Sequence, residues 1–116
     1  MLYRRVFTTA SEEELKALDD YHKAACSGEF QASILQTALD IDVSEDLPKL
    51  KCPTLIIHSL RDNYVPFDEA CRTASLIPGA KLEPLDSANN FALPSDPEFA
   101  RWGQLILDFA KKHGRD

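Results

Sequence analysis

The chain is poor in glycine and cysteine, and both shortages argue against particular kinds of site. Its 116 residues include four glycines, no two of which bracket a serine, and three cysteines. Cys26, Cys52 and Cys71 are odd in number and lack the close spacing of metal ligands. We therefore expect three buried, free thiols in a reducing compartment, with no disulfide and no metal site.

Positive charge and long apolar runs are also scarce. The formal net charge is -6, which disfavours a nucleic-acid surface, because phosphate binding needs a basic stripe. No apolar run approaches the roughly twenty residues that cross a bilayer. Met1–Ala10 has arginines but no apolar stretch behind them, unlike a signal peptide. We expect a cytoplasmic protein without nucleic-acid or membrane partners.

The overall composition is that of a folded domain. Hydrophobic residues make up 44% of the chain and charged residues 28%, which is close to ordinary globular usage. A chain of this length permits one domain of common size. We expect a single domain over residues 1–116, with helices in residues 1–45 and a β-α-β-α unit in residues 46–116.

Two amphipathic helices are predicted in the first third of the chain. Ser11 and Glu14 have the spacing of a capping box, and apolar residues then recur at helical spacing as far as Ala25. Ser27-Gly28 interrupts this pattern. A second apolar stripe is made of Phe30, Ile34, Ala38 and Ile41. We expect both stripes to pack into the core, with the two helices forming an antiparallel or angled pair.

The acidic segment Asp40–Pro48 carries four carboxylates, which is a pattern that also occurs in calcium loops. It lacks the central glycine and the twelfth-position glutamate of an EF-hand. We therefore expect solvated carboxylates here and no bound metal.

The second half of the chain predicts a strand, a helix, a second strand and a last helix. Thr54–Ile57 is an apolar run suited to a strand buried on both faces of a parallel sheet. A helical segment, Phe67–Ile77, the turn Pro78-Gly79 and a strand at Lys81–Leu85 follow. These elements form one βαβ unit, whose crossover should be right-handed.

The last helix is predicted to begin at Asp96-Pro97 and to end near Gly114. Its final turn carries basic residues, which suits the negative end of the helix dipole. The apolar stripe of this helix, which we expect to face the core, consists of Phe99, Trp102, Ile106 and Phe109.

Two segments resemble α/β-hydrolases. Cys52–Pro66 is similar to the pattern "PTLxxHxxxDxxVP", and Lys81–Leu93 is similar to the closing catalytic loop of that family. The resemblance extends over Phe7–Phe109. Over this range the chain is similar to the hydrolase-like modules that bacteria fuse to nucleotide cyclases or helix-turn-helix regulators. It implies a partial α/β-hydrolase fold, with two cap helices in residues 1–45 followed by a β-α-β-α carboxyl-terminal unit with a short parallel sheet.

The resemblance also implies a degenerate catalytic triad. Asp62 matches the triad acid, but Asn90 stands where the family has its histidine base, and an amide takes up no proton near neutral pH. No G-x-S-x-G turn is present to carry a nucleophile. Cys26, with Ser27-Gly28 after it, is the residue most similar to a nucleophile in such a turn, although it follows a helical pattern rather than a strand. We expect the Asn90 amide to donate a hydrogen bond to the Asp62 carboxylate.

These features leave two functions open. The first is a hydrolase-derived, non-catalytic module that acts in ligand or partner binding, with no cofactor. The second is the carboxyl-terminal portion of an active ester-type hydrolase whose nucleophile comes from a missing or separate segment. In either case, we expect this chain alone to be inactive.

The oligomeric state provides a test of the predicted sheet. A sheet of two parallel strands leaves one edge of the strand at residues 53–59 unpaired, and such edges attract further strands. We predict a homo-oligomer, in the simplest case a dimer that covers this edge, unless a complementary hydrolase half does so. Size-exclusion chromatography with light scattering at tens of micromolar protein should report the dimer mass. A compact monomer would contradict the prediction.

Overall fold

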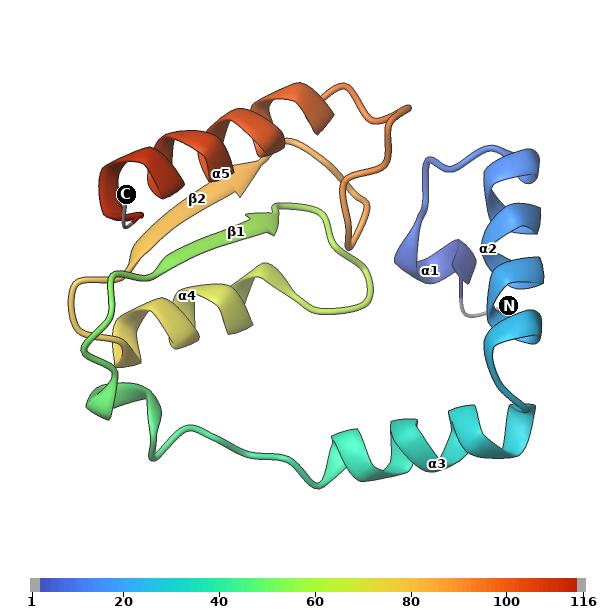
Figure 1. Ribbon diagram of the computed structural model, residues 1–116, viewed down its shortest axis with the longest axis horizontal. Helices are drawn as coiled ribbons and strands as arrows, with labels where there is room; N and C mark the ends of the chain where they lie inside the picture. Colours follow the sequence, from blue (N-terminus) through green and yellow to red (C-terminus); the bar gives the residue numbers. More distant parts are fainter. Residues whose placement is uncertain (1–2, 115–116) are drawn as a thin grey trace.

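A parallel pair of strands lies between two helices (Figure 1). The computed structural model describes residues 3–114. The elements of this unit are β1 (Leu55–Ser59), α4 (Phe67–Leu76), β2 (Lys81–Leu85) and α5 (Phe99–His113). Figure 1 shows α4 and α5 on opposite sides of the strands. The order β-α-β-α agrees with the prediction, and the mixed helices and small parallel sheet are compatible with a partial α/β fold. The ends of the predicted domain, Met1 and Asp116, lie outside the described residues.

The two strands run in parallel register and end at the same level. Leu55 is opposite Lys81, and Ser59 is opposite Leu85. The ladder continues past the strands, because the Arg61 amide donates to the Ser87 carbonyl over 3.0 Å. This register brings the loop after β1 beside the loop after β2, which is the edge where catalytic groups collect in open α/β sheets.

The prediction that β1 is buried on both faces is wrong. Ser59 alone is buried in this strand, and the other four residues are half-buried. Among the described residues, β1 pairs only with β2. A sheet of two strands cannot cover its own outer edge, so the apolar run of β1 keeps partial contact with solvent.

Helix α4 is the crossover between the strands and matches its prediction closely. Pro66 precedes the helix, and acidic residues occupy its first turn. Ala70 and Ile77 are buried at 5% and 6% exposure. Gly79 then turns the chain toward β2 with φ of +70°, a conformation that residues with a Cβ atom rarely adopt.

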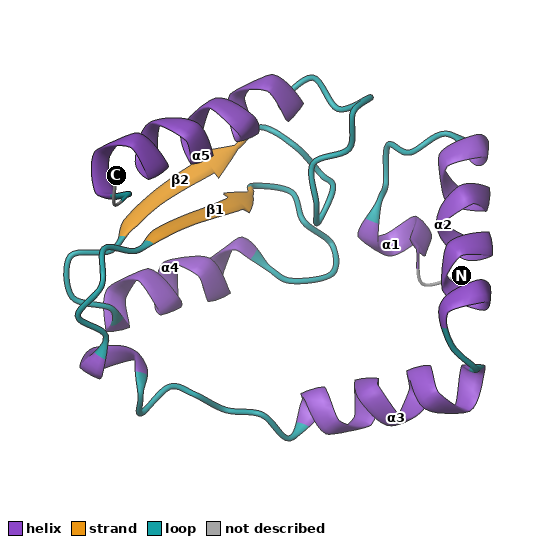
Figure 2. Ribbon diagram, viewed as in Figure 1, coloured by secondary structure: helices purple, strands orange, loops and turns teal. Residues whose placement is uncertain are grey.

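The amino-terminal helices form an arm beside the sheet (Figure 2). Its elements are α1 (Tyr3–Val6), α2 (Glu12–Ala25) and α3 (Gly28–Leu39). The 3-10 turn η1 (Leu47–Lys49) lies apart from the arm and contacts α4. The predicted capping box is present, since the Ser11 hydroxyl accepts from the Glu14 amide and the Glu14 carboxylate accepts from the Ser11 amide. Ser27 caps α3 in a similar way, so it starts the second helix rather than only ending the first. Figure 2 shows α2 and α3 meeting at a wide angle.

The prediction that the stripe on α3 packs into the core is wrong. Phe30 is 57% exposed, Ile34 51% and Ile41 64%, Ala38 is exposed as well, and α3 contains no buried residue. The helix stands away from the strands (Figure 1). The radius of gyration, 16.1 Å, is accordingly larger than the value of about 13 Å expected for a compact domain of this length. The amphipathic spacing thus predicted the helix correctly, but it could not show whether another element packs against the apolar face.

Burial differs from prediction at the cysteines and on α5 as well. Cys52 and Cys71 are exposed and Cys26 is only half-buried, so the expected buried thiols are wrong. Cys71 follows the buried Ala70 and therefore points away from the inner face of α4. Helix α5 contains no buried residue either, because the narrow sheet covers only part of its apolar stripe.

The carboxylates of the acidic segment between α3 and β1 face solvent, as predicted. The four carboxylates of residues 40–48 are exposed. The Asp42 carboxylate accepts from the Ser44 amide over 2.9 Å, and Asp46 pairs with Lys49 over 2.6 Å. Both are local surface contacts, which contribute little to stability.

A buried asparagine, which the sequence analysis did not single out, ties the arm to the sheet. Asn89 is 0% exposed. Its side-chain nitrogen donates to the Thr9 hydroxyl over 2.6 Å and to the Asp96 carboxylate over 2.7 Å, while its oxygen accepts from the Thr9 amide over 3.0 Å. Phe7 and Asn89 also form an isolated antiparallel bridge. The segment before α2 is therefore fastened to the loop after β2.

Asp96 is the charged centre of this network. It is 5% exposed and accepts hydrogen bonds from the Ser87 hydroxyl, the Asn89 amide group and the Glu98 backbone N–H. Burial alone would raise the pKa of this carboxyl, but the hydrogen bonds together hold its pKa below the ordinary value. Helix α5 begins at Phe99 and not at Asp96-Pro97 as predicted.

The network makes stability depend on the charge of Asp96. We predict that Asp96→Asn lowers the free energy of unfolding at pH 7 by about 1–3 kcal/mol, because an amide nitrogen cannot accept the bonds that the carboxylate accepts. The folded-state pKa is lower than the unfolded one, so the wild-type advantage is full above the unfolded pKa, about 4, and is lost as pH falls through the folded value.

Urea unfolding of the wild type and of Asp96→Asn between pH 7 and pH 2.5 measures this difference. Asp108→Asn, at an exposed carboxylate that accepts from Gln104, is the matched control and should change little. A difference between Asp96→Asn and the wild type that does not shrink in acid would contradict the assignment.

Candidate functional site

Asp62 lies three residues beyond the end of β1, where the loop folds back on its carboxylate. The Asp62 Oδ1 atom accepts from the amides of Tyr64 and Val65, over 2.7 and 3.0 Å. The side chain of Asp62 is 0% exposed. Short polar side chains commonly shape turns in this way, so part of the role of Asp62 is to set the path of the loop.

Asn90 contacts the other oxygen of the same carboxylate. The Asn90 Nδ2 atom donates to Asp62 Oδ2 over 2.8 Å, which confirms the predicted hydrogen bond. The backbone N–H of Asn90 donates to the Val6 carbonyl over 2.7 Å, so the arm helps to hold this residue. The interpretation of Asp62 as a former triad acid and of Asn90 as the replacement for a base stays a prediction.

His58 is the neighbour that the sequence analysis did not place. Its Nε2 atom lies 2.8 Å from the Val65 carbonyl oxygen and 3.5 Å from Asp62 Oδ2. A carbonyl can only accept, so we assign the proton to Nε2. The ring is 15% exposed. The His-x-x-x-Asp spacing within Cys52–Pro66 was the sequence signal that could have predicted this contact. The contact orders the loop, and it does not present His58 as an exposed base.

The arrangement satisfies the buried Asp62 carboxylate with hydrogen bonds from both sides. Asp62 accepts from two backbone amides and from one neutral side-chain amide. Asparagine offers no basic nitrogen, so it cannot accept a proton from a nucleophile. Cys26 ends α2 rather than following a strand, as its sequence context predicted. Chemically, the site can hold a charge and shape a loop.

A surface hollow of about 690 Å³ adjoins Asp62 at this edge of the sheet. It is lined by Thr8 from the arm, residues 60–63, Pro66, Phe67, Asp68 and Ala88. Ligand sites of small molecules have volumes of this order. Residues from three separate segments thus meet where the strands end.

Two other features are absent from residues 3–114. No group of three or more His, Cys, Asp or Glu side chains gathers there in a way that could hold a metal ion. In the same part of the chain, no helix combines the length and apolar character needed to cross a membrane.

Comparison with known proteins identifies relatives of the hydrolase kind. A candidate carbamate hydrolase, RutD, from Caulobacter sp. (strain K31) is 30% identical over 83 residues, which are 71% of this chain and 31% of the relative. The non-heme chloroperoxidase CPO-A1 of Kitasatospora aureofaciens is 36% identical over 74 residues, 61% of this chain and 26% of the relative. RutD of Stutzerimonas stutzeri (strain A1501), also named as a candidate carbamate hydrolase, is 29% identical over 109 residues, 92% of this chain and 40% of the relative.

These similarities support an α/β-hydrolase-like relationship. No family model and no solved structure matches the chain. The chain spans only 26% to 40% of the length of these relatives. The relationship therefore concerns ancestry and fold, and the activities of the whole relatives do not follow from it.

The contact between Asp62 and Asn90 can be tested by changing the amide to a second carboxylate. We predict that Asn90→Asp lowers the free energy of unfolding at pH 7 by about 1–3 kcal/mol, because a hydrogen bond is replaced by repulsion between like charges. Repulsion makes the folded pair bind protons more tightly than the unfolded chain does, so stability should fall as pH rises and return in acid.

Chemical denaturation at pH 7 and pH 4 measures this effect. Gln36→Glu makes the same amide-to-acid change at an exposed position of α3. This control should leave the free energy of unfolding nearly unchanged at both pH values. Equal behaviour of the two variants would show that Asn90 and Asp62 are not coupled in solution.

Proposed function

We propose that this chain is a hydrolase-derived, non-catalytic module that acts in ligand or partner binding. The observation that carries the proposal is the 2.8 Å hydrogen bond from the Asn90 amide to the buried Asp62 carboxylate. In an α/β-hydrolase-like site this position would need a base, and loss of the serine or the histidine of a triad costs turnover on the order of 10⁶-fold in subtilisin. The Asn90 amide provides the Asp62 carboxylate with a hydrogen bond, but it cannot act as a base in proton transfer.

The hollow beside Asp62 supports a role in ligand binding. Its lining joins the polar side chains of Thr8, Arg61 and Asp68 to the apolar side chains of Leu60 and Phe67. Pockets that combine apolar walls with a few polar groups suit small organic ligands. The resemblance to modules fused to bacterial regulators is consistent with a sensing role, and a cytoplasmic location and self-association remain parts of the proposal.

A second candidate function rests on the incomplete cover of β1. Four of its five residues are half-buried, and the relatives are about two and a half to four times as long as the region that they share with this chain. A separate segment that supplies further strands and a G-x-S-x-G nucleophile would cover this edge and form an ester-type hydrolase. This candidate predicts such a motif in the coding sequence upstream of Met1 or in a partner chain.

Esterase assays separate the two candidates. We predict that the chain alone hydrolyses p-nitrophenyl acetate no faster than an equal concentration of Asp62→Ala, because neither has both a nucleophile and a base. The measurement is the initial rate at pH 7.5 over a range of ester concentrations, with the buffer rate subtracted. Circular dichroism controls for the folding of the variant.

Two results would overturn the non-catalytic proposal. One is saturable hydrolysis by the chain alone that Asp62→Ala abolishes. The other is hydrolysis that develops only when a polypeptide with a G-x-S-x-G turn is added and that again depends on Asp62, which would establish the second candidate.

A further inference from the structure

A second hollow lies at the opposite end of the sheet from Asp62. It has a volume of about 410 Å³ and is formed where β1 and β2 begin and α5 ends. Its lining consists of Pro53, Thr54, Leu55, Gly79, Lys81, Leu105, Asp108, Phe109, Lys112 and His113. The proposed function above makes no use of this end of the molecule.

The walls of this hollow are apolar and belong to the sheet and to α5. Leu55 from β1, and Leu105 and Phe109 from α5, are all half-buried. The Phe109 ring is tilted against the His113 ring, with 4.6 Å between the ring centroids. A short hydrocarbon or aromatic group placed between these side chains would remove apolar surface from water, which is the main source of affinity in small pockets.

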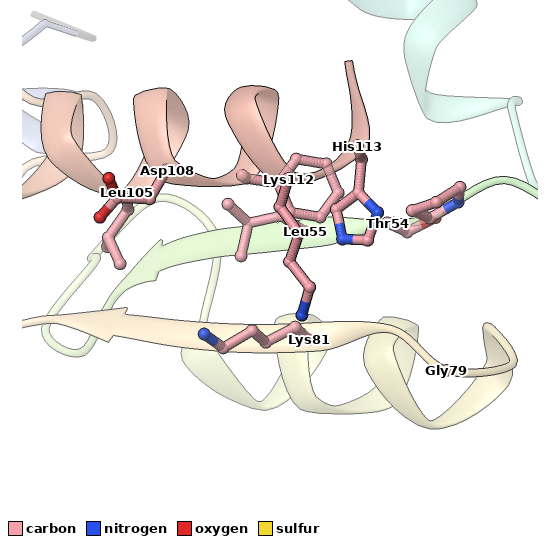
Figure 3. Close-up of a pocket in the computed structure, with 10 residues that line it drawn as sticks. Thr54, Leu55, Gly79, Lys81, Leu105, Asp108, Lys112 and His113 are labelled. Carbon is pink, nitrogen blue, oxygen red and sulfur yellow. The ribbon is translucent and has the colours of Figure 1, made fainter. Parts of the chain in front are cut away.

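The rim of the hollow is cationic. Figure 3 shows Lys112 reaching from α5 toward β2, from which Lys81 projects. Lys81 Nζ is paired with the Glu83 carboxylate over 2.8 Å. Lys112 makes no ion pair with any residue in the range 3–114. Within the described part of a chain of net charge -6, no carboxylate neutralises this ammonium group.

The one acid in the lining is engaged elsewhere. Asp108 Oδ1 accepts from the Gln104 amide over 2.7 Å, and Figure 3 shows Asp108 nearer the start of α5 than Lys112. Basic residues at a helix end often do no more than complement the helix dipole. Lys111 and Lys112 share that setting, but only Lys112 lines the hollow.

We propose that this hollow binds a small organic anion with an apolar body, such as a short-chain carboxylate. The hydrocarbon part lies between Leu55, Leu105 and Phe109, and the carboxylate meets the Lys112 ammonium at the rim with Lys81 nearby. A charge-assisted contact of this kind adds to the apolar burial. The site is independent of Asp62, so its failure and the failure of the proposed function are separate outcomes.

Hexanoate is the probe, and the ¹⁵N–¹H correlation spectrum of the full chain is the readout. At constant pH and ionic strength, hexanoate should cause saturable shifts at the amides of Leu55, Gly79 and Lys81, with no comparable shifts at Asp62 or Asn90. Hexan-1-ol, which has the same apolar body without the charge, should bind more weakly. Inorganic phosphate, which has charge without an apolar body, should also bind more weakly.

Adjacent lysines provide the matched variants. Lys112→Ala should weaken hexanoate binding about tenfold, because it removes the ionic partner of the carboxylate. Lys111→Ala makes the same change in net charge one residue away and should leave the dissociation constant within about twofold. Both side chains are exposed, so neither variant should disturb folding.

Several outcomes would overturn the proposal. They are an absence of saturable shifts at the hollow, equal binding of hexan-1-ol or of phosphate, and equal weakening by Lys111→Ala and Lys112→Ala. The last result would mean that hexanoate responds only to net charge and not to a site.

Discussion

Two buried carboxylates, Asp62 and Asp96, hold together the loops at the edge of the sheet where the strands end. Counting backbone and side chain together, Asp62 and Asp96 are 8% and 5% exposed, and a charged group in such a place must have its hydrogen bonds made within the protein. The partners of Asp62 come from its own loop and from Asn90. The partners of Asp96 include Asn89, which also binds Thr9. Two neighbouring asparagines therefore connect the loop after β2 to the loop after β1 and to the amino-terminal arm.

Under the proposed function, the same contacts explain how a hydrolase-derived site keeps its loop geometry without catalysis. A catalytic base and a structural donor make different demands, since a base must release and take up a proton whereas a donor only has to point at the carboxylate. Asn90 meets the second demand with a 2.8 Å hydrogen bond. The loop geometry needs only that donor, so it is compatible with an amide where proton transfer would be lost.

Local elements were predicted well, and burial was predicted poorly. The bounds of β2, the capping box of α2 and the glycine after α4 agree with the structure, because these features depend on residues close together in the chain. The apolar stripes of α3 and α5 were expected in the core and are largely exposed or half-buried. Periodicity identifies an apolar face, but another element must lie against that face to bury it.

The amino-acid sequence by itself determined the order of the elements, the absence of a glycine-bracketed serine and the presence of an amide where a base was expected. Spacing and side-chain chemistry are local properties, so they could be interpreted without coordinates. Only the tertiary structure decided that Asn89 is fully buried, that His58 lies beside Asp62, and that Lys112 shares a hollow with Lys81. The approach of Lys112 to Lys81 joins residues distant in the chain and depends on the packing of α5, whereas the approach of His58 to Asp62 depends on the path of the loop after β1.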